Sequence, residues 1–549
     1  MKIVLAQLNT TVGDIDGNTR KILAAVKKAA RQHAELVIFP EAAITGYPAL
    51  DLWNDRGFIA ANLRALDKLA GKIGDTAALV GYIDFNRART GNPLQNCAAL
   101  LHKGKIRARQ AKTLLPTYDV FDEDRYFAPA LSNKPINFKG VKLGVTICED
   151  VWTESRLAQR HLYRENPVRE LMRRQPDLIV NLSASPFHIG KPDLRRELLC
   201  GHAKKHGIPF LYCNQVGGND NLVFDGGSLA VDRAGRVVAR GAQFKEELIN
   251  LEFPFPQNTA PAPDPGISDT EQAARALSLG IGDFVRKCGF SSVILGLSGG
   301  IDSAVVAALA VDALGPENVI GVSMPTRYTS GISKNDAREL AGNLGLTQFH
   351  ELPIEGVFGA FTDALKTPFK GMKPDTAEEN LQARIRGTML MAISNKLRAL
   401  LLATGNKSEF SVGYSTLYGD MNGALAPLGD APKVLVYDIA RWYNTTRERG
   451  IPRRTITRAP SAELRPGQTD QDDLPPYETI DPIIAAYIEH NAVPEEIAAQ
   501  GFASRTVAGI LARIDRNEFK RKQAPPVLKI TTKAFGTGRR MPIARGYHR

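Results

Sequence analysis

The sequence has few cysteines, and their spacing brings none of them together. Five cysteines are spread through 549 residues, with no CxxC pair and no Cys/His cluster of zinc-site spacing. A disulfide-linked scaffold is therefore disfavoured, and reduced thiols are expected. The five positions are Cys97, Cys148, Cys200, Cys213 and Cys288.

Long apolar runs are also missing. No uncharged stretch approaches the ~18 residues of a membrane span, and the apolar run at the N-terminus ends at Gln7, too soon for a signal peptide. Hydrophobic residues nevertheless make up 43% of the chain. That share is ample for packed cores, and it excludes disordered and collagen-like classes. We expect a cytoplasmic enzyme without a membrane partner.

Positive charge is concentrated at one end of the chain. The formal net charge is +12, and the last 45 residues, from Arg505 to Arg549, hold 12 Lys/Arg against 2 Asp/Glu. Such a tail could bind nucleic acid, a membrane surface or a phosphorylated small molecule. Composition does not decide among these partners.

A proline-rich segment divides the chain. Five prolines fall within the thirteen residues 254–266, which indicates an extended spacer. Ser268 and Glu271 then match a capping box that opens a helix toward Lys287. We predict a first domain over 1–252, a linker over 253–267 and a second domain over 268–549.

Both halves show α/β patterns. In the first half, apolar runs alternate with amphipathic segments, such as a helical pattern over 18–33. The second half alternates strands with helices that begin at 303 and 333, which predicts a parallel sheet covered on both faces. Two polar segments, 366–379 and 452–480, are predicted to be functional lids or partly disordered loops. The predicted strands are 2–8, 36–39, 77–83, 141–147, 178–182, 209–213, 292–297 and 319–324.

The most specific motif is a glycine- and serine-rich loop, LGLSGGIDS at 295–303, between a predicted strand and a predicted helix. Paired glycines let the backbone approach a phosphate, while serine hydroxyls and a helix N-terminus donate to it. No lysine stands at the Walker position, which disfavours γ-phosphate transfer.

This loop resembles the SGGxDS loop of the ATP pyrophosphatases, which adenylate an oxygen and release diphosphate. The resemblance implies Mg²⁺, held by Asp302 and by Glu409 in the segment 403–409. On spacing alone, Glu409 could equally be a solvated carboxylate at a helix start.

Further segments resemble the NAD⁺ synthetases: 379–386, 403–409, 419–420, 427–433, 460–466 and 474–477. Asp420 could hold ribose hydroxyls, and basic side chains could meet ATP and a dinucleotide, although each alone could be a surface charge. These basic residues are Arg384, Arg386, Lys433 and Lys520. The resemblance implies ATP binding by Gly296, Leu297, Ser298, Gly299, Gly300, Ile301, Asp302, Ser303 and Thr404. It implies binding of deamido-NAD⁺ by Asn380, Glu409 and Lys520.

Cys148 stands at the end of the predicted strand 141–147. A thiol at a strand end can be an exposed nucleophile near backbone N–H groups, although a lone Cys there is more often part of a core. Glu41 also follows a strand, and Lys112 lies in a loop ahead of Glu123. These segments resemble the nitrilase and carbon–nitrogen hydrolase family over most of residues 1–250.

That resemblance implies a catalytic triad. Glu41 would take the thiol proton, Cys148 would attack an amide, and Lys112 would stabilise the oxyanion, with Glu123 in support. The other four cysteines are interpreted as structural. Six histidines lie outside any nucleophile motif: His33, His102, His161, His188, His202 and His206.

Together the halves resemble the glutamine-dependent NAD⁺ synthetases. This implies a nitrilase-like α-β-β-α sandwich joined to a Rossmann-like ATP-pyrophosphatase domain. The implied reaction converts deamido-NAD⁺, ATP and glutamine to NAD⁺, AMP, diphosphate and glutamate, with ammonia passing between the sites. Tyr118, Ser185 and Lys191 would bind glutamine, although relatives often carry Arg at the last position. We also expect a homodimer or a higher homo-oligomer, and no nucleic-acid partner.

Two alternatives stay open at this point. One is an amidotransferase of the same construction that adenylates a different acid, against which the segments 379–386 and 460–477 argue. The other is an RNA-modifying enzyme with the same SGGxDS loop, whose tail would hold RNA and whose binding would weaken steeply with salt.

Overall fold

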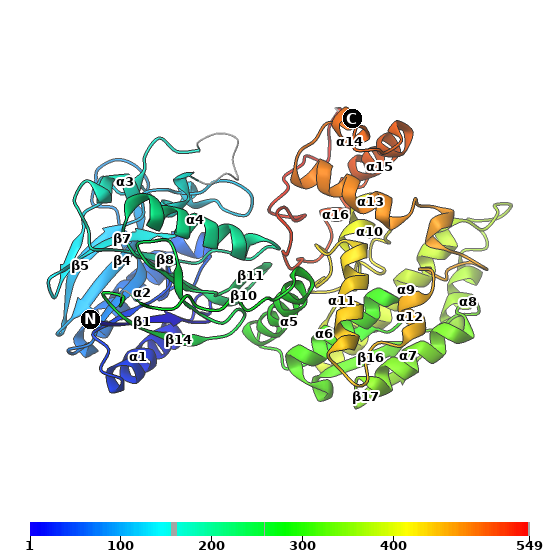
Figure 1. Ribbon diagram of the computed structural model, residues 1–549. Coiled ribbons are helices and arrows are strands. Elements are labelled where there is room, and N and C mark those ends of the chain that lie inside the picture. Colours follow the sequence, from blue (N-terminus) through cyan, green and yellow to red (C-terminus); the bar gives the residue numbers. More distant parts are fainter. Residues whose placement is uncertain (155–161, 257, 547–549) are drawn as a thin grey trace. The chain divides into compact units, whose positions relative to one another are not determined.

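The computed structural model describes residues 1–154, 162–256 and 258–546. The chain forms two compact units, Met1–Gly266 and Ile267–Arg549 (Figure 1). The division between them falls at the end of the proline-rich segment 254–266. His161, and Tyr547 of the basic segment 505–549, lie outside the described residues. In the part of the chain that the structure covers, none of the helices has the length and apolar composition of a membrane span.

The first unit holds two six-stranded sheets, in the orders β14-β1-β2-β3-β4-β5 and β13-β12-β9-β8-β7-β6. The first sheet contains β1 (Lys2–Gln7), β2 (Leu36–Ile38), β3 (Ala77–Phe85), β4 (Leu94–His102), β5 (Lys105–Ala111) and β14 (Glu247–Glu252). The second contains β6 (Ile136–Phe138), β7 (Val141–Ile147), β8 (Leu178–Ser183), β9 (Phe210–Asn214), β12 (Leu229–Val231) and β13 (Val237–Arg240). A separate hairpin joins β10 (Val216–Asn219) to β11 (Leu222–Asp225).

Helices cover the outer faces of these sheets. They are α1 (Ile15–Arg31), α2 (Arg56–Lys72), α3 (Pro167–Met172) and α4 (Lys191–His206), with 3-10 turns at η1 (Leu50–Asn54), η2 (Glu123–Arg125) and η3 (Cys148–Glu154).

Alternation along the strands builds the layers. In β1, Ile3 and Leu5 face the core between the two sheets, while Val4 and Ala6 face the core beneath α1 and α2. A third core packs the second sheet against α3 and α4. The predicted α-β-β-α sandwich is therefore confirmed.

The second unit is built on a parallel sheet in the order β17-β16-β15-β18. Its strands are β15 (Val293–Gly296), β16 (Val319–Ser323), β17 (Gln348–Glu351) and β18 (Leu400–Leu401). Ile294, Val322 and Ile385 belong to a core between the sheet and the helices α8 and α9. The helix α6 contacts β15 and β16 and packs with α5 and α11 (Figure 1). The predicted parallel sheet is confirmed.

The helices of this unit are α5 (Asp269–Lys287), α6 (Ile301–Leu314), α7 (Gly331–Asn343), α8 (Glu355–Ala364), α9 (Thr376–Leu397), α10 (Lys407–Val412), α11 (Lys433–Thr445), α12 (Arg453–Thr457), α13 (Tyr477–Ile484), α14 (Pro494–Ala498), α15 (Ser504–Arg516) and α16 (Glu518–Arg521). Shorter turns are η4 (Pro316–Asn318), η5 (Asp470–Asp472) and the π-helix η6 (Ala485–Glu489).

Some predicted boundaries were wrong. The helix after the phosphate loop begins at Ile301 and not at Ser303, because Gly300 is its extended N-cap. Residues 376–379 are the first turn of α9, opened by a capping box between Asp375 and Glu378. The segment 452–480 is not a plain loop, since it contains α12, η5 and the start of α13.

Candidate active sites

Cys148 lies at a sharp turn between β7 and η3. It has a positive φ of 42°, in the left-handed region that non-glycine residues seldom adopt. The strand β8 runs parallel to β7, and Asn181 of β8 donates a hydrogen bond to the Cys148 carbonyl at 3.4 Å. Strained backbone of this kind aims a side chain in a direction that regular structure does not allow.

The predicted triad residues Glu41 and Lys112 meet in the buried interior of the first unit. Lys112 Nζ lies 2.8 Å from Glu41 Oε1 and 2.7 Å from Glu123 Oε1, and all three side chains are buried. The other oxygen of Glu41 accepts from the Ala184 N–H at 3.0 Å, directly after β8. Glu41, Lys112 and Ala184 follow the ends of β2, β5 and β8, so these three strand ends place the Glu41 carboxylate and two of its partners.

The Cys148 thiol belongs to the same electrostatic group. Burial raises the pKa of Cys148 well above its usual value, Glu41 raises it further, and Lys112 lowers it. For Lys112, burial acts to lower the pKa, but the carboxylates of Glu123 and Glu41 outweigh it and raise the pKa. The resting pair is thus a protonated thiol beside a charged ammonium. Such a thiol needs a base at the moment of attack.

The sequence analysis missed two polar residues that bond to the carboxylates of this buried group. Asn96 of β4 donates to Glu41 Oε1 at 2.7 Å, and Tyr47 donates to Glu123 Oε1 at 2.7 Å. Both are buried. No local motif marks either one, because their role depends on contacts between distant segments.

Asp150 ties two parts of this site together. Its Oδ1 accepts from the N–H groups of Thr113 at 3.0 Å and Leu114 at 2.9 Å, just after Lys112. Its Oδ2 accepts from the Ile147 N–H at 2.9 Å, just before Cys148. One buried carboxylate therefore fixes the loop of Lys112 against the turn of Cys148.

Two of the three predicted glutamine-binding residues converge on η3. The Tyr118 hydroxyl donates to Glu149 Oε1 at 2.9 Å, and Lys191 Nζ lies 4.5 Å from the centre of the Trp152 ring. Ser185 is buried after β8 and donates its N–H to Asn214 Oδ1 at 2.9 Å. The Tyr118 hydroxyl and the Lys191 ammonium therefore lie against the segment that follows Cys148.

In the second unit, the loop 295–303 joins β15 to α6. Gly299 has φ +80°, and a Cβ there would lie 2.3 Å from the Ser333 carbonyl oxygen, so only glycine fits. Ser298 Oγ accepts from the Gly300 N–H at 3.1 Å and lies 3.1 Å from Ser303 Oγ. The loop is closed by its own hydroxyls.

A cavity of about 540 Å³ opens at this loop. Its walls include residues of α9, the segment 404–420 and the segment 458–473. Among the loop residues predicted to bind ATP, Gly299 alone does not line this cavity. Its carbonyl accepts a hydrogen bond from Arg458 at 3.0 Å. The predicted residues that do line it are Gly296, Leu297, Ser298, Gly300, Ile301, Asp302, Ser303, Asn380, Thr404, Glu409 and Lys520.

The two predicted metal ligands converge on one ammonium. Lys433 Nζ lies 2.5 Å from Asp302 Oδ2 and 3.0 Å from Glu409 Oε1. Asn406 Nδ2 donates to Asp302 Oδ1 at 2.9 Å. Burial raises the pKa of Glu409 to about 8, partly opposed by Lys433.

The donor set of this pair fits Mg²⁺ only in part. Across the described residues, no group of three or more His, Cys, Asp or Glu side chains could hold a metal ion by itself. Two carboxylates at the mouth of a phosphate loop suit a magnesium ion that takes its remaining oxygens from substrate phosphates.

Asn380 and Lys520, which with Glu409 are predicted to bind the dinucleotide, line the same cavity. Asn380 Oδ1 accepts from the Thr416 hydroxyl at 2.6 Å. Lys520 Nζ donates to the carbonyls of Gly413 and Ser415, at 2.8 Å each. Burial lowers the pKa of Arg386 to about 10, and Arg386 lines the same space. Its guanidinium stays charged at neutral pH.

Arg458 was missed by the sequence analysis. It donates to the Gly299 carbonyl and, at 2.9 Å, to Ser333 Oγ, and it lines the cavity. Ser333 in turn donates to Glu463 at 2.7 Å. Arg458 thereby attaches the segment 452–480 to the phosphate loop. The only sequence signal for this role was that Arg458 lies in a polar segment predicted to be functional.

Comparison with known proteins separates the same two regions. Residues 2–257 match the carbon–nitrogen hydrolase family, and residues 273–524 match the NAD synthase family. A glutamine-dependent NAD⁺ synthetase from Synechocystis sp. is 47% identical over 100% of this chain and 99% of its own. The chain belongs to the glutamine-dependent NAD⁺ synthetase family.

Further glutamine-dependent NAD⁺ synthetases extend the match to other organisms. The protein from Thermotoga maritima is 43% identical over 100% of this chain and 99% of its own. A solved structure of the glutamine-dependent NAD⁺ synthetase from Acinetobacter baumannii, in complex with ADP, is 38% identical with a TM-score of 0.78. It covers 99% of this chain and 98% of that one. Both constellations described above therefore lie within regions shared with this family.

Proposed function

We propose that this chain forms NAD⁺ from deamido-NAD⁺, ATP and glutamine, and releases AMP, diphosphate and glutamate. The observation that carries the proposal is the presence, in one chain, of two complete sites. The first holds a buried thiol beside a carboxylate–lysine pair, and the second opens a phosphate loop into a cavity of about 540 Å³. One site releases ammonia, and the other consumes it.

In the first site, Glu41 takes the proton of the Cys148 thiol as sulfur attacks the glutamine carboxamide. The Lys112 ammonium stabilises the negative charge that develops on the carbonyl oxygen. Collapse of this intermediate forms a thioester and expels ammonia, which leaves with the proton from Glu41. Water, deprotonated by Glu41, then releases glutamate and restores the thiol. The high thiol pKa makes a base necessary in the first step.

Three side chains recognise glutamine in this proposal. Tyr118 and Lys191 contact residues of η3, and Ser185 follows β8. The Lys191 ammonium is a single point charge and would pair with the substrate carboxylate without the two parallel bonds of an arginine.

In the second site, the loop 296–303 binds the phosphates of ATP, and Thr404 lines the same cavity. Asn380, Glu409 and Lys520 hold deamido-NAD⁺, and the carboxylate of this substrate attacks the α-phosphorus of ATP. Diphosphate leaves, and an acyl-adenylate remains. Ammonia then attacks the acyl carbon, AMP leaves, and the amide of NAD⁺ is formed. Lys433, Arg386 and Arg458 hold positive charge around these groups.

Mg²⁺, held by Asp302 and Glu409 together with phosphate oxygens, would neutralise charge on the departing diphosphate. Lys433 keeps the two carboxylates together by its ion pairs.

We also infer that ammonia passes directly between the two sites, because free ammonia is mostly protonated at neutral pH and is then not nucleophilic. Joining both sites in one chain raises the local ammonia concentration. A homodimer or a higher homo-oligomer is the expected assembly.

The basic tail needs no nucleic-acid partner on this account. Arg539 pairs with Glu518 at 2.9 Å, and Arg545 pairs with Asp515 at 2.6 Å, within the same unit. Lys520 of the tail lines the cavity.

The test is the stoichiometry of the purified chain supplied with deamido-NAD⁺, ATP, Mg²⁺ and glutamine. We expect NAD⁺, AMP, diphosphate and glutamate in equal amounts. Formation of ADP in place of AMP, or no NAD⁺ from folded protein, would refute the proposal.

A further inference from the structure

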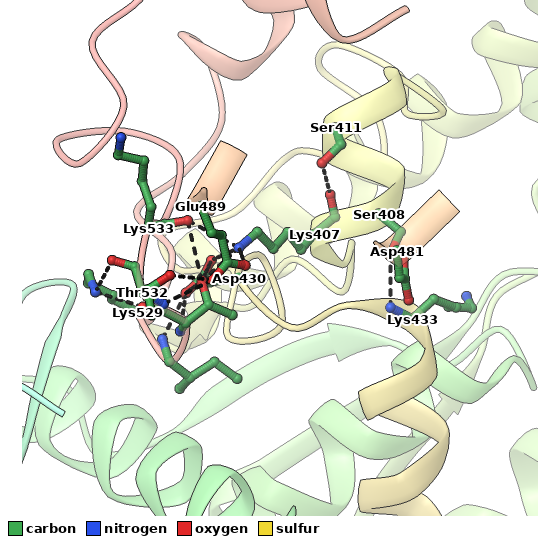
Figure 2. A network of polar contacts seen from close by, with 12 residues as sticks. Lys407, Ser408, Ser411, Asp430, Lys433, Asp481, Glu489, Lys529, Thr532 and Lys533 are labelled. Atoms are coloured by element: carbon green, nitrogen blue, oxygen red, sulfur yellow. Dashed lines mark hydrogen bonds and ion pairs between the residues drawn. The ribbon is translucent and has the colours of Figure 1, made fainter. Parts of the chain in front are cut away.

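Lys407 is buried at the first residue of α10, and its ammonium is surrounded by oxygens. Its Nζ lies 2.9 Å from Glu489 Oε1 and 3.1 Å from Asp430 Oδ1. It also donates to Thr531 Oγ1 at 2.6 Å and to the Lys533 carbonyl at 3.1 Å. Figure 2 shows the Lys407 side chain directed into this group of oxygens, away from Ser408 and Asp481.

The second oxygens of the same two carboxylates bind the C-terminal segment 530–533. Asp430 Oδ2 accepts from the N–H groups of Ile530 and Thr531, at 2.8 Å each. Glu489 Oε2 accepts from the Thr532 N–H at 3.2 Å. Lys407 therefore stands where three distant parts of the chain join: the end of the π-helix η6, the loop before α11, and the C-terminal segment (Figure 2).

The residues on either side of Lys407 are bonded to residues that line the nucleotide cavity. Asn406, the N-cap of α10, donates to Asp302 and accepts from the Glu409 N–H at 3.0 Å. Glu409 pairs with Lys433. Ser408 Oγ accepts from the Lys433 N–H at 2.9 Å. Consecutive residues of one short helix thus bind the C-terminal segment, Lys433 and the phosphate loop.

We propose that Lys407 is a positioning residue of the adenylation site, through which the C-terminal segment 530–533 sets the orientation of α10. The inference rests on the proposed function, because it assigns a role to α10 in binding the nucleotide.

The helix α10 cannot fix its own orientation. It has only six residues, and a helix that short has almost no intrinsic stability. Its placement must therefore come from side-chain contacts. The Lys407 ammonium supplies four of these contacts at the buried end. If they are lost, Asp430 and Glu489 remain buried without their cation, and the first residue of α10 loses its attachment to the C-terminal segment.

A small rotation of α10 would change the geometry of the nucleotide site. Asn406 and Glu409 would both move relative to Asp302 and Lys433. The effect should therefore appear as weaker nucleotide binding, and not only as a smaller active fraction.

The test compares Lys407→Met, Thr531→Val and a matched control, Lys396→Met. Lys396 lies exposed on α9, so the control removes the same charge without touching α10. Thr531→Val acts entirely from the C-terminal segment and removes one acceptor of the ammonium. The readouts are the KM for ATP with ammonium as nitrogen donor, the affinity for ADP without added Mg²⁺ by calorimetry, and the thermal unfolding temperature.

We expect the KM for ATP and the Kd for ADP to rise by about 10-fold or more in Lys407→Met and by about 3-fold in Thr531→Val. The control should match the wild type. Unchanged KM and Kd values, with only a lower kcat or a lower unfolding temperature, would overturn the inference and leave Lys407 a structural residue. If Lys407→Met does not fold, Thr531→Val decides the question by the same criteria. If wild-type protein made no NAD⁺, the proposed function would fail, whereas the ADP affinities would still test the role of Lys407.

Discussion

Glu41 and Lys112 form an ion pair of 2.8 Å although both side chains are fully buried. A buried pair of this kind is costly to break, because removal of one partner leaves an uncompensated charge. Lys112 compensates two carboxylates, since it also pairs with Glu123. Its loss should therefore affect stability as well as catalysis.

We expect Lys112→Met to lower glutamine hydrolysis by about 100- to 1,000-fold, because the oxyanion loses its cation. The free energy of unfolding should fall by about 3 kcal/mol. Steady-state glutaminase assays and chemical denaturation measure the two effects. Lys105→Met, an exposed change on the strand β5 that precedes Lys112, is the control. Equal losses in both variants would contradict the assigned role.

Asp150→Asn tests the connection between the loop of Lys112 and the turn of Cys148. An amide has one acceptor oxygen in place of two, so it cannot accept from both Leu114 and Ile147. We expect glutamine hydrolysis to fall by at least about 10-fold, while ammonium-dependent NAD⁺ synthesis stays within about 2-fold of wild type. The exposed Asp67→Asn on α2 serves as the comparison. An Asp150→Asn enzyme with normal glutaminase activity would show that the connection is dispensable.

The pH dependence of glutamine hydrolysis should report on Glu123. Burial raises its pKa to about 7, partly opposed by Lys112, so a larger share of the carboxyl is protonated as the pH falls below 7. Protonation removes one of the two negative charges that hold Lys112. We expect kcat/KM for glutamine to decline below about pH 7, and this decline to disappear or shift to lower pH in Glu123→Gln. The exposed Glu197→Gln should keep the wild-type profile. An identical profile in Glu123→Gln would assign the decline to another group.

Gly299→Ala tests the phosphate loop. Its positive φ and the Ser333 carbonyl oxygen, 2.3 Å from a Cβ, leave no space for a side chain. We expect a loss of about 1–3 kcal/mol in stability, together with weaker ATP binding. Gly342→Ala, on the helix α7 where a Cβ meets nothing within 4 Å, should be neutral or slightly stabilising. Calorimetric unfolding and the KM for ATP check both variants. Normal ATP binding by a stable Gly299→Ala protein would mean that the loop geometry does not require glycine.

Much of the fold could be predicted because it is encoded locally. The strand β7 has the predicted bounds 141–147, and Ser268 is the N-cap of α5 as expected, accepting from the Glu271 N–H, although the Glu271 side chain pairs with Arg275 and does not complete the predicted capping box. The α6 start was placed two residues late, since nothing in the sequence distinguishes an extended Gly300 from a helical one. Apolar periodicity is a local signal, and local signals fix elements better than their ends.

The site was only partly predictable for a different reason. Resemblance to known families indicated Glu41, Lys112 and Cys148, which the structure places in one electrostatic group. It gave no indication of Asn96 or Tyr47, whose hydrogen bonds join segments more than 50 residues apart. The attachment of Lys407 to Thr531, across 124 residues, was likewise invisible in the sequence. Such contacts depend on tertiary packing and leave no periodic pattern.

The most direct test of the two-site account is NAD⁺ formation by Cys148→Ala with each nitrogen donor. The reaction contains deamido-NAD⁺, ATP and Mg²⁺, with either glutamine or ammonium, and wild-type protein is run in parallel. The account predicts that the variant loses NAD⁺ synthesis from glutamine and keeps it from ammonium, because the thiol is needed only to release ammonia. Synthesis from glutamine by Cys148→Ala, or no synthesis from ammonium by either folded protein, would contradict it.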